Sequence, residues 1–249
     1  PGVTLVVDGE EAKAFWQPIS PTLDLLDLKL PRRYPLATEK VVFFGEPVAL
    51  IIAEDPYIAE DAALAVEVEY EELDTNTDVF ESLKQKGRNL IYPEWEDNTQ
   101  VDYAFERGPV NKCFQSADLV IEENITSHRY GAMPLETRVV RAEFDDSEGS
   151  LVVHSSTQVP HQMRLYLAQV FGLKENRIQV IAGDVGGGFG AKLSVDCEFL
   201  PVLGSILTGK PIKWSESRSG WIQAGFAARD YHATSKAAFT KDGKLLALE

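Results

Sequence analysis

The most informative segment of the chain is Asp184-Val185-Gly186-Gly187-Gly188-Phe189-Gly190-Ala191-Lys192. It follows an apolar run at 178–182 that predicts a β-strand, and it precedes a predicted helix. Four glycines in five positions allow positive φ angles and let a large ligand approach the backbone closely. The N–H groups of such a loop, with the N-terminus of a following helix, favour anionic atoms such as phosphate, dithiolene sulfur or a metal oxo group.

This glycine loop does not match the common nucleotide-binding motifs. The Walker A pattern GxxxxGK[ST] is absent, and the glycine spacing does not fit the dinucleotide pattern GxGxxG with its later acidic residue. By itself, the loop is therefore equally compatible with a ligand site and with a ligand-free turn between a strand and a helix.

Two segments upstream of the loop also carry polar groups. In Ser155-Ser156-Thr157-Gln158, the Gln158 amide could donate to a ligand oxygen, but a helix cap by Ser156 or Thr157 is the simpler interpretation. The second segment, at 128–138, combines one histidine, two arginines and Glu136. Taken alone, it favours a buried ion-pair and turn segment.

Hydrophobic periodicity predicts alternating strands and helices around these segments. We expect strands at 119–126, 139–144, 151–155, 178–182 and 212–214, helices at 160–170 and 199–207, and a hairpin at 232–248 that turns at 241–244. The N-terminal region predicts a strand–strand–helix–strand unit at 41–44, 48–53, 57–65 and 66–70. The region between 72 and 109 is polar and loses periodicity, which is typical of a linker.

Composition excludes several classes of function. The 249 residues carry a net charge of −15, and no run of Lys or Arg offers a nucleic-acid surface. The two cysteines, Cys113 and Cys197, are far apart, so neither a zinc site nor an iron–sulfur cluster is indicated, and reduced thiols in the cytoplasm are expected. No apolar run is long enough for a membrane span. Because the sequence starts at Pro1, we expect a processed, trimmed or fragmentary chain.

The motifs, taken in order, resemble the molybdenum hydroxylases, the family of xanthine oxidase, carbon monoxide dehydrogenase and aldehyde oxidoreductase. The resemblance rests on Pro134-Leu135-Glu136-Thr137-Arg138, on Ser156-Thr157-Gln158 followed by Pro160-His161, and on the glycine loop. Earlier segments at 36–41, 45–49, 59–63 and 66–73 look like the hammerhead α/β domain of that family.

The resemblance implies an α+β fold with two incomplete domains. Residues 1–75 would be a hammerhead-like domain lacking its N-terminal part, and residues 76–112 would be a linker. Residues 113–249 would be the first part of a molybdenum-cofactor-binding mixed α/β domain that lacks its C-terminal part.

It also implies a cofactor and site residues. The expected cofactor is molybdenum-molybdopterin, in some members extended to a cytosine dinucleotide, completed by regions outside this chain and bound with no metal ligand from the protein. The resemblance assigns Gln158 to a hydrogen bond with an oxygen on molybdenum, and the backbone of Gly187, Gly188, Phe189 and Gly190 to cofactor contact. Phe189 would also wall the substrate channel, so Gln158 and Phe189 are the residues expected to act in catalysis.

Two departures from the family pattern limit these expectations. Leu193 stands where purine-oxidising members place a substrate-binding glutamate, so xanthine is disfavoured as a substrate. The catalytic glutamate of the family is expected outside this chain. Of the carboxylates near the motifs, Glu136 is interpreted as structural and Glu198 as lying on a helix surface.

The sequence therefore predicts part of the large subunit of a molybdenum-dependent oxidoreductase, inactive alone. It would hydroxylate an aldehyde or similar small substrate, or oxidise carbon monoxide. Its expected partners are the rest of the large subunit or a separate C-terminal chain, an iron–sulfur subunit and a flavin subunit. The alternatives are a catalytically incomplete scaffold fragment of the same family and an unrelated phosphate-binding protein.

Overall fold

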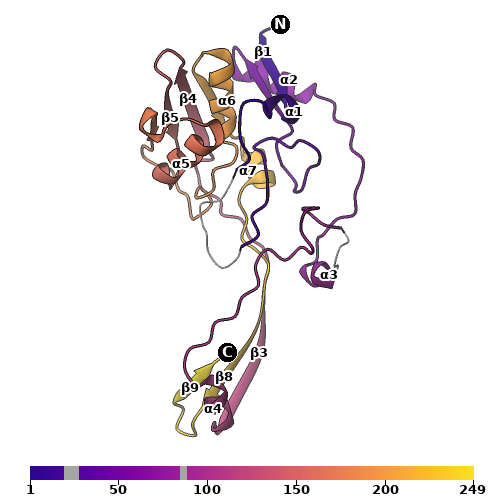
Figure 1. Cartoon of the computed structure of the whole chain (residues 1–249), viewed down its shortest axis with the longest axis vertical. Coiled ribbons are helices and arrows are strands. Elements are labelled where there is room, and N and C mark those ends of the chain that lie inside the picture. The colour runs from indigo at the N-terminus through magenta and orange to yellow at the C-terminus, as the bar shows by residue number, and fades with distance from the viewer. Residues whose placement is uncertain (20–27, 85–88) are drawn as a thin grey trace. The chain divides into compact units, whose positions relative to one another are not determined.

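The computed structural model describes residues 1–19, 28–84 and 89–249 and contains both helices and β-sheets (Figure 1). The chain is α+β, as predicted. It packs as two compact units that do not follow chain order: unit 1 is Pro1–Val101 with Ala132–Phe226, and unit 2 is Asp102–Gly131 with Ala227–Glu249. The domain boundaries proposed from the sequence stay a prediction, and residues 85–88 of the expected linker lie outside the described ranges.

A four-stranded sheet lies at the centre of unit 1, with the strand order β6-β5-β4-β7. Its strands are β4 (Val139–Asp145), β5 (Ser150–Ser155), β6 (Ile178–Ile181) and β7 (Ile212–Ser215). β5 and β6 run parallel, and the other neighbouring strands are antiparallel. The predictions of all four strands are confirmed.

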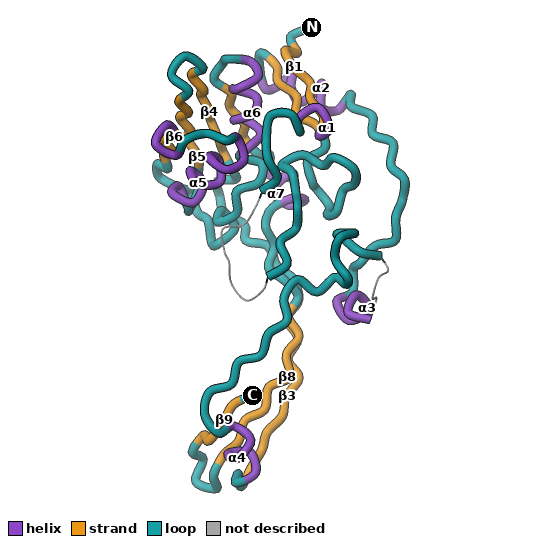
Figure 2. The backbone as a smooth tube through the Cα atoms, viewed as in Figure 1, coloured by secondary structure: helices purple, strands orange, loops and turns teal. Residues whose placement is uncertain are grey.

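Two helices, α5 (Pro160–Phe171) and α6 (Phe199–Thr208), lie beside this sheet (Figure 2). α5 connects β5 to β6, because parallel neighbours need a long crossover connection that is usually helical. The helices end at Gly172 and Gly209, as predicted.

One face of the sheet packs against these helices. Along β4 and β5, buried and more exposed side chains alternate, because successive residues of a strand point to opposite faces. Trp16 brings the N-terminal region into the same core, with its ring 6.2 Å from that of Phe171. The main buried residues from the sheet and the two helices are Val140, Ala142, Leu151, Val153, Met163, Leu167, Phe199, Val202 and Leu203.

The remaining elements of unit 1 are short. β1 (Val3–Asp8) pairs antiparallel with β2 (Ala49–Ala53). The helix predicted at 57–65 is α2 (Pro56–Leu64), which begins where the Asp55 carboxylate accepts the N–H groups of Tyr57 and Ile58. The other elements are α1 (Gly9–Ala12), α3 (Val79–Lys84), the 3₁₀ turn η1 (Glu175–Arg177) and α7 (Arg218–Ala224).

Two strand predictions in the N-terminal region are wrong. Residues 41–44 lead into a turn, because the Glu46 carboxylate accepts the N–H of Val42 at 2.7 Å and the Glu46 N–H donates to the Phe43 carbonyl. Residues 66–70 are exposed and have no regular secondary structure, and no strand pairs with them within the described ranges. Alternating apolar residues form a strand only where another strand completes their hydrogen bonds.

Unit 2 is a three-stranded antiparallel sheet with the order β3-β8-β9. β3 (Leu119–Ser127) pairs with β8 (Tyr231–Phe239) over its whole length, and β9 (Leu245–Leu248) pairs with the other edge of β8. The helix α4 (Val110–Gln115) contacts β9. The predicted hairpin is confirmed, and Thr240 and Lys244 close its turn through a backbone hydrogen bond of 3.0 Å.

Replacing Phe199 by alanine should lower the free energy of unfolding by about 3–5 kcal/mol, because the side chain is fully buried and its removal leaves a cavity. Chemical denaturation measures this change. Phe44, which is 78% exposed, is the matched control, and Phe44→Ala should change the value by less than about 0.5 kcal/mol. Equal effects of the two substitutions would contradict the described core.

Candidate functional site

The glycine loop turns back sharply at Phe189 and Gly190. The Ala191 N–H donates to the Gly188 carbonyl at 2.8 Å, which closes a four-residue turn. Both central residues have positive φ, 51° at Phe189 and 84° at Gly190, which is the pattern of a type I′ turn. A phenylalanine in this conformation stores strain of about 1–3 kcal/mol, and such strain gathers at functional sites. Its side chain is 77% exposed, so the strain does not serve core packing.

Gln158 lies directly against this loop. Its backbone N–H donates to the Lys192 carbonyl at 3.1 Å, and its Oε1 accepts the Lys192 N–H at 3.2 Å. A Cβ at Gly188 would lie 2.5 Å from the Gln158 Cδ, so any larger residue would have to displace the Gln158 side chain. Gly187 sits against Pro134, where a Cβ would lie 3.2 Å from the Pro134 Cβ. The structure thus brings Gln158 and the four loop residues of the predicted site together.

Glu136 and Lys192 form an ion pair that contacts the glycine loop. The Lys192 Nζ lies 2.8 Å from the Glu136 Oε2, and the same oxygen accepts the Gly186 N–H at 2.9 Å. Burial opposes ionisation of Glu136, but the Lys192 ammonium and the Gly186 N–H outweigh it and hold the pKa of this carboxyl below its ordinary value. The interpretation of Glu136 as a structural residue is confirmed.

The segment that carries Glu136 is held by α7. The Arg218 guanidinium donates to the carbonyls of Pro134 and Leu135 at 2.8 and 2.7 Å. The indole N–H of Trp221 donates to the Ala132 carbonyl at 2.8 Å. These contacts fix the main chain at 132–135 and leave the Leu135 side chain exposed. Sequence reasoning missed Arg218, because no local pattern links it to a segment more than eighty residues earlier.

Arg138 and Glu216 anchor the other end of this segment. Both are buried, and the guanidinium meets the carboxylate through two hydrogen bonds of 2.6 and 3.0 Å. The rings of Trp214 and Trp221 lie 5.7 and 5.8 Å from the guanidinium carbon, within cation–π range. Burial alone would lower the pKa of Arg138, but the hydrogen bonds to Glu216 reverse this effect and raise it. The predicted ion-pair character of the 128–138 segment is therefore confirmed at Arg138.

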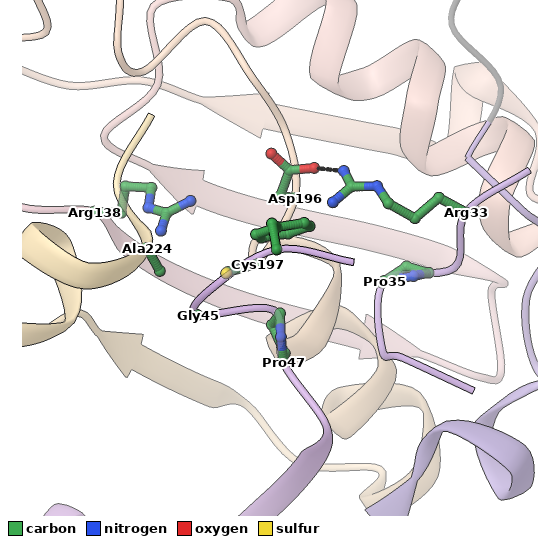
Figure 3. A pocket seen from close by; sticks show the side chains of 9 residues that line it. Arg33, Pro35, Gly45, Pro47, Arg138, Asp196, Cys197 and Ala224 are labelled. Atoms are coloured by element: carbon green, nitrogen blue, oxygen red, sulfur yellow. Dashed lines mark hydrogen bonds and ion pairs between the residues drawn. The ribbon is translucent and has the colours of Figure 1, made fainter. Parts of the chain in front are cut away.

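A small pocket lies beside this ion pair (Figure 3). Its volume of about 30 Å³ is room for water molecules and not for an organic cofactor. Arg33 forms an ion pair with Asp196 in its wall, and Cys197 lines it. Burial raises the pKa of the Cys197 thiol to about 12, so this group stays protonated at neutral pH.

Two local expectations near the loop are wrong. Neither Ser156 nor Thr157 caps α5, because Ser156 Oγ accepts the Val139 N–H and Thr157 Oγ1 accepts the Val159 N–H. Glu198 is 3% exposed rather than on a helix surface, and burial raises the pKa of its carboxyl.

The site therefore depends on backbone groups and one amide more than on titratable side chains. Within residues 1–19, 28–84 and 89–249, no three His, Cys, Asp or Glu side chains gather closely enough to hold a metal ion. In the same ranges, no helix combines the length and apolar character needed to cross a membrane.

Family models match nearly the whole chain. Residues 1–74 match the aldehyde oxidase and xanthine dehydrogenase a/b hammerhead domain, and residues 91–249 match the molybdopterin cofactor-binding domain. The chain belongs to the molybdenum hydroxylase family. The fold class and the resemblance inferred from the glycine loop and its two upstream motifs are therefore confirmed.

The molybdenum hydroxylases similar to this chain are large subunits of several enzymes. The large chain of carbon monoxide dehydrogenase from Afipia carboxidovorans is 35% identical over 86% of this chain and 28% of its own length. The nicotine 6-hydroxylase large subunit from Paenarthrobacter nicotinovorans is 34% identical over 84% of this chain and 26% of its own length. The structure of quinoline 2-oxidoreductase from Pseudomonas putida 86 matches with a TM-score of 0.90 and 32% identity, over 100% of this chain and 31% of that one. The chain thus spans less than a third of these relatives.

Replacing Glu216 by glutamine should lower the free energy of unfolding by about 3 kcal/mol, because it leaves the Arg138 charge buried without a counter-charge. Glu143→Gln is the matched control, since Glu143 pairs with Arg141 at 2.8 Å on the surface. Exposed pairs contribute at most about 1 kcal/mol. Denaturant titration of both variants checks the difference, and an equally small effect at Glu216 would argue against a buried ion pair.

Proposed function

We propose that this chain is the molybdenum-cofactor-binding part of an oxidoreductase large subunit. The observation that carries the proposal is the juxtaposition of a strained, glycine-rich turn with the Gln158 amide. Gln158 and Gly188 approach so closely that a side chain at position 188 would displace the Gln158 carboxamide. Such a surface leaves N–H groups accessible to a bulky, anionic group.

The residues present fit a molybdopterin cofactor. The Gln158 Oε1 is occupied by the Lys192 N–H, so its amide NH₂ is the donor available for an oxygen of the cofactor. The backbone of Gly187, Gly188, Phe189 and Gly190 would line the cofactor, and the protein would contribute no metal ligand. When bound, the cofactor supplies the redox chemistry, with electrons passing to iron–sulfur and flavin partners.

Phe189 and Leu193 would shape the substrate side of this site. Both side chains are exposed, and neither can form a hydrogen bond with a purine. We therefore favour an aldehyde or similar small molecule for oxidative hydroxylation, or carbon monoxide. The relatives named above act on carbon monoxide, nicotine and quinoline, which supports a small substrate without choosing among these classes.

The complete enzyme would require residues outside this chain. A general base must lie within hydrogen-bonding reach of its proton, and the family's glutamate is expected from the remainder of the large subunit or from a separate C-terminal chain. We also propose that the cofactor is the cytosine dinucleotide form and that the protein is cytoplasmic. The alternative is a catalytically incomplete scaffold of the same family, favoured only by the exposure of both Gln158 and Phe189.

The molybdenum content of the chain, purified with its natural partners and measured by elemental mass spectrometry, tests the proposal. We expect close to one molybdenum per chain, because the glycine loop and Gln158 would hold the cofactor in the assembly. An intact native assembly without molybdenum would favour the scaffold instead.

Replacing Gly188 by alanine should reduce molybdenum retention by about tenfold or more, because the added methyl group displaces the Gln158 side chain, and tenfold corresponds to about 1.4 kcal/mol. Gly183→Ala is the matched control, since a Cβ there meets nothing within 4 Å. Molybdenum content and thermal unfolding of both variants should be compared. Equal retention in the two variants would refute the role of Gly188.

A further inference from the structure

A single carboxylate oxygen holds both ends of the glycine loop. The Glu136 Oε2 accepts the Gly186 N–H at 2.9 Å and also the Lys192 ammonium at 2.8 Å. A second contact between Glu136 and Gly186, from the Glu136 N–H to the Gly186 carbonyl, measures 3.1 Å. Gly186 and Lys192, at the two ends of the glycine loop, therefore bind the same oxygen, which restricts how far these ends can separate.

The same lysine also orients Gln158. The Lys192 N–H and carbonyl bind the side-chain oxygen and the backbone N–H of Gln158, at 3.2 and 3.1 Å. The Thr157 hydroxyl donates to the same carbonyl at 3.4 Å. Because the carboxamide oxygen is occupied, its NH₂ group must face away from Lys192. A displacement of Lys192 would therefore move both the loop and the Gln158 amide.

Burial of its lysine makes this ion pair different from the surface pairs of the chain, although the Glu136 side chain is 33% exposed. The Lys192 side chain is 1% exposed, although lysine is rarely buried without a partner. A surface Lys–Glu pair such as Lys13–Glu10 is exposed to solvent and contributes little to stability. A buried ammonium fixed by one carboxylate has few alternative positions, so it can define the geometry of the residues around it.

We infer that Lys192 and Glu136 are positioning residues, which close the glycine loop and direct the Gln158 NH₂ group toward the bound ligand. This inference rests on the proposed function of the loop as the cofactor-binding surface. Neither side chain touches the reacting atoms in this arrangement. Their effect on turnover passes through the loop backbone and the Gln158 amide.

The test replaces Lys192 by methionine in the complete enzyme, purified with its natural partners. Hydrogen–deuterium exchange of amides 186–192 should accelerate at least tenfold, which corresponds to about 1.4 kcal/mol, while exchange in the β3–β8 pair of unit 2 stays unchanged. The kcat should fall by about tenfold with a smaller change in KM, because substrate binding does not use the ion pair directly. Lys13→Met is the matched control and should change neither exchange in the loop nor kcat.

A double variant, Lys192→Met with Glu136→Met, separates positioning from simple stability. Replacing both partners by apolar groups removes the unpaired charge, so the thermal midpoint should recover toward that of the unsubstituted enzyme. The second substitution also removes the Glu136 carboxylate that accepts the Gly186 N–H, so fast exchange in the loop and a low kcat should persist. Recovery of slow exchange and of kcat in the double variant would overturn the inference.

Two measurements keep this test separate from the proposed function. The molybdenum content of the unsubstituted enzyme decides whether the loop serves the cofactor, whereas exchange of amides 186–192 reports on the ion pair with or without cofactor. If Lys192→Met does not fold, Glu136→Gln provides the same test, because it keeps the acceptor for Gly186 and removes only the charge. Loop exchange and kcat equal to those of the unsubstituted enzyme in both single variants would also overturn the inference.

Discussion

The buried ion pair between Arg138 and Glu216 is the interaction on which the arrangement of the site depends. It joins the start of β4 to the residue after β7, and backbone contacts between the same two residues support it. The rings of Trp214 and Trp221 lie over the guanidinium within cation–π range. Since a charge of this kind cannot remain buried without its partner, the direction in which the chain leaves residue 138 toward Glu136 is fixed.

The segment at 132–138 connects this ion pair to the glycine loop. Arg218 and Trp221 hold the main chain at 132–135 through hydrogen bonds to its carbonyl groups. The Glu136 carboxylate then accepts the Gly186 N–H of the loop. The surface offered to a ligand consists mainly of peptide groups, whose positions follow from φ and ψ rather than from side-chain rotamers. This construction explains why strain is stored at Phe189, where a bulky residue adopts a left-handed conformation.

The chemistry of the site is consistent with membership of the molybdenum hydroxylases. In such enzymes the cofactor performs the electron transfer, and the protein binds and orients it. Under the proposed function, the loop backbone and the Gln158 amide would perform that task. The apolar side chains of Leu135, Phe189 and Leu193 are exposed beside or within the loop. Titratable groups near the loop, such as Glu136, are engaged in holding the backbone.

The sequence by itself determined the strands and helices around the loop, the hairpin at 232–248 and the close order of the three motifs. These features follow from local periodicity and turn chemistry, which act over a few residues. Only the tertiary structure decided that residues 66–70 form no strand, that Glu198 is buried, and that Lys192 pairs with Glu136 across 56 positions. Pairing and burial depend on which distant segments pack together, and no local pattern records that choice.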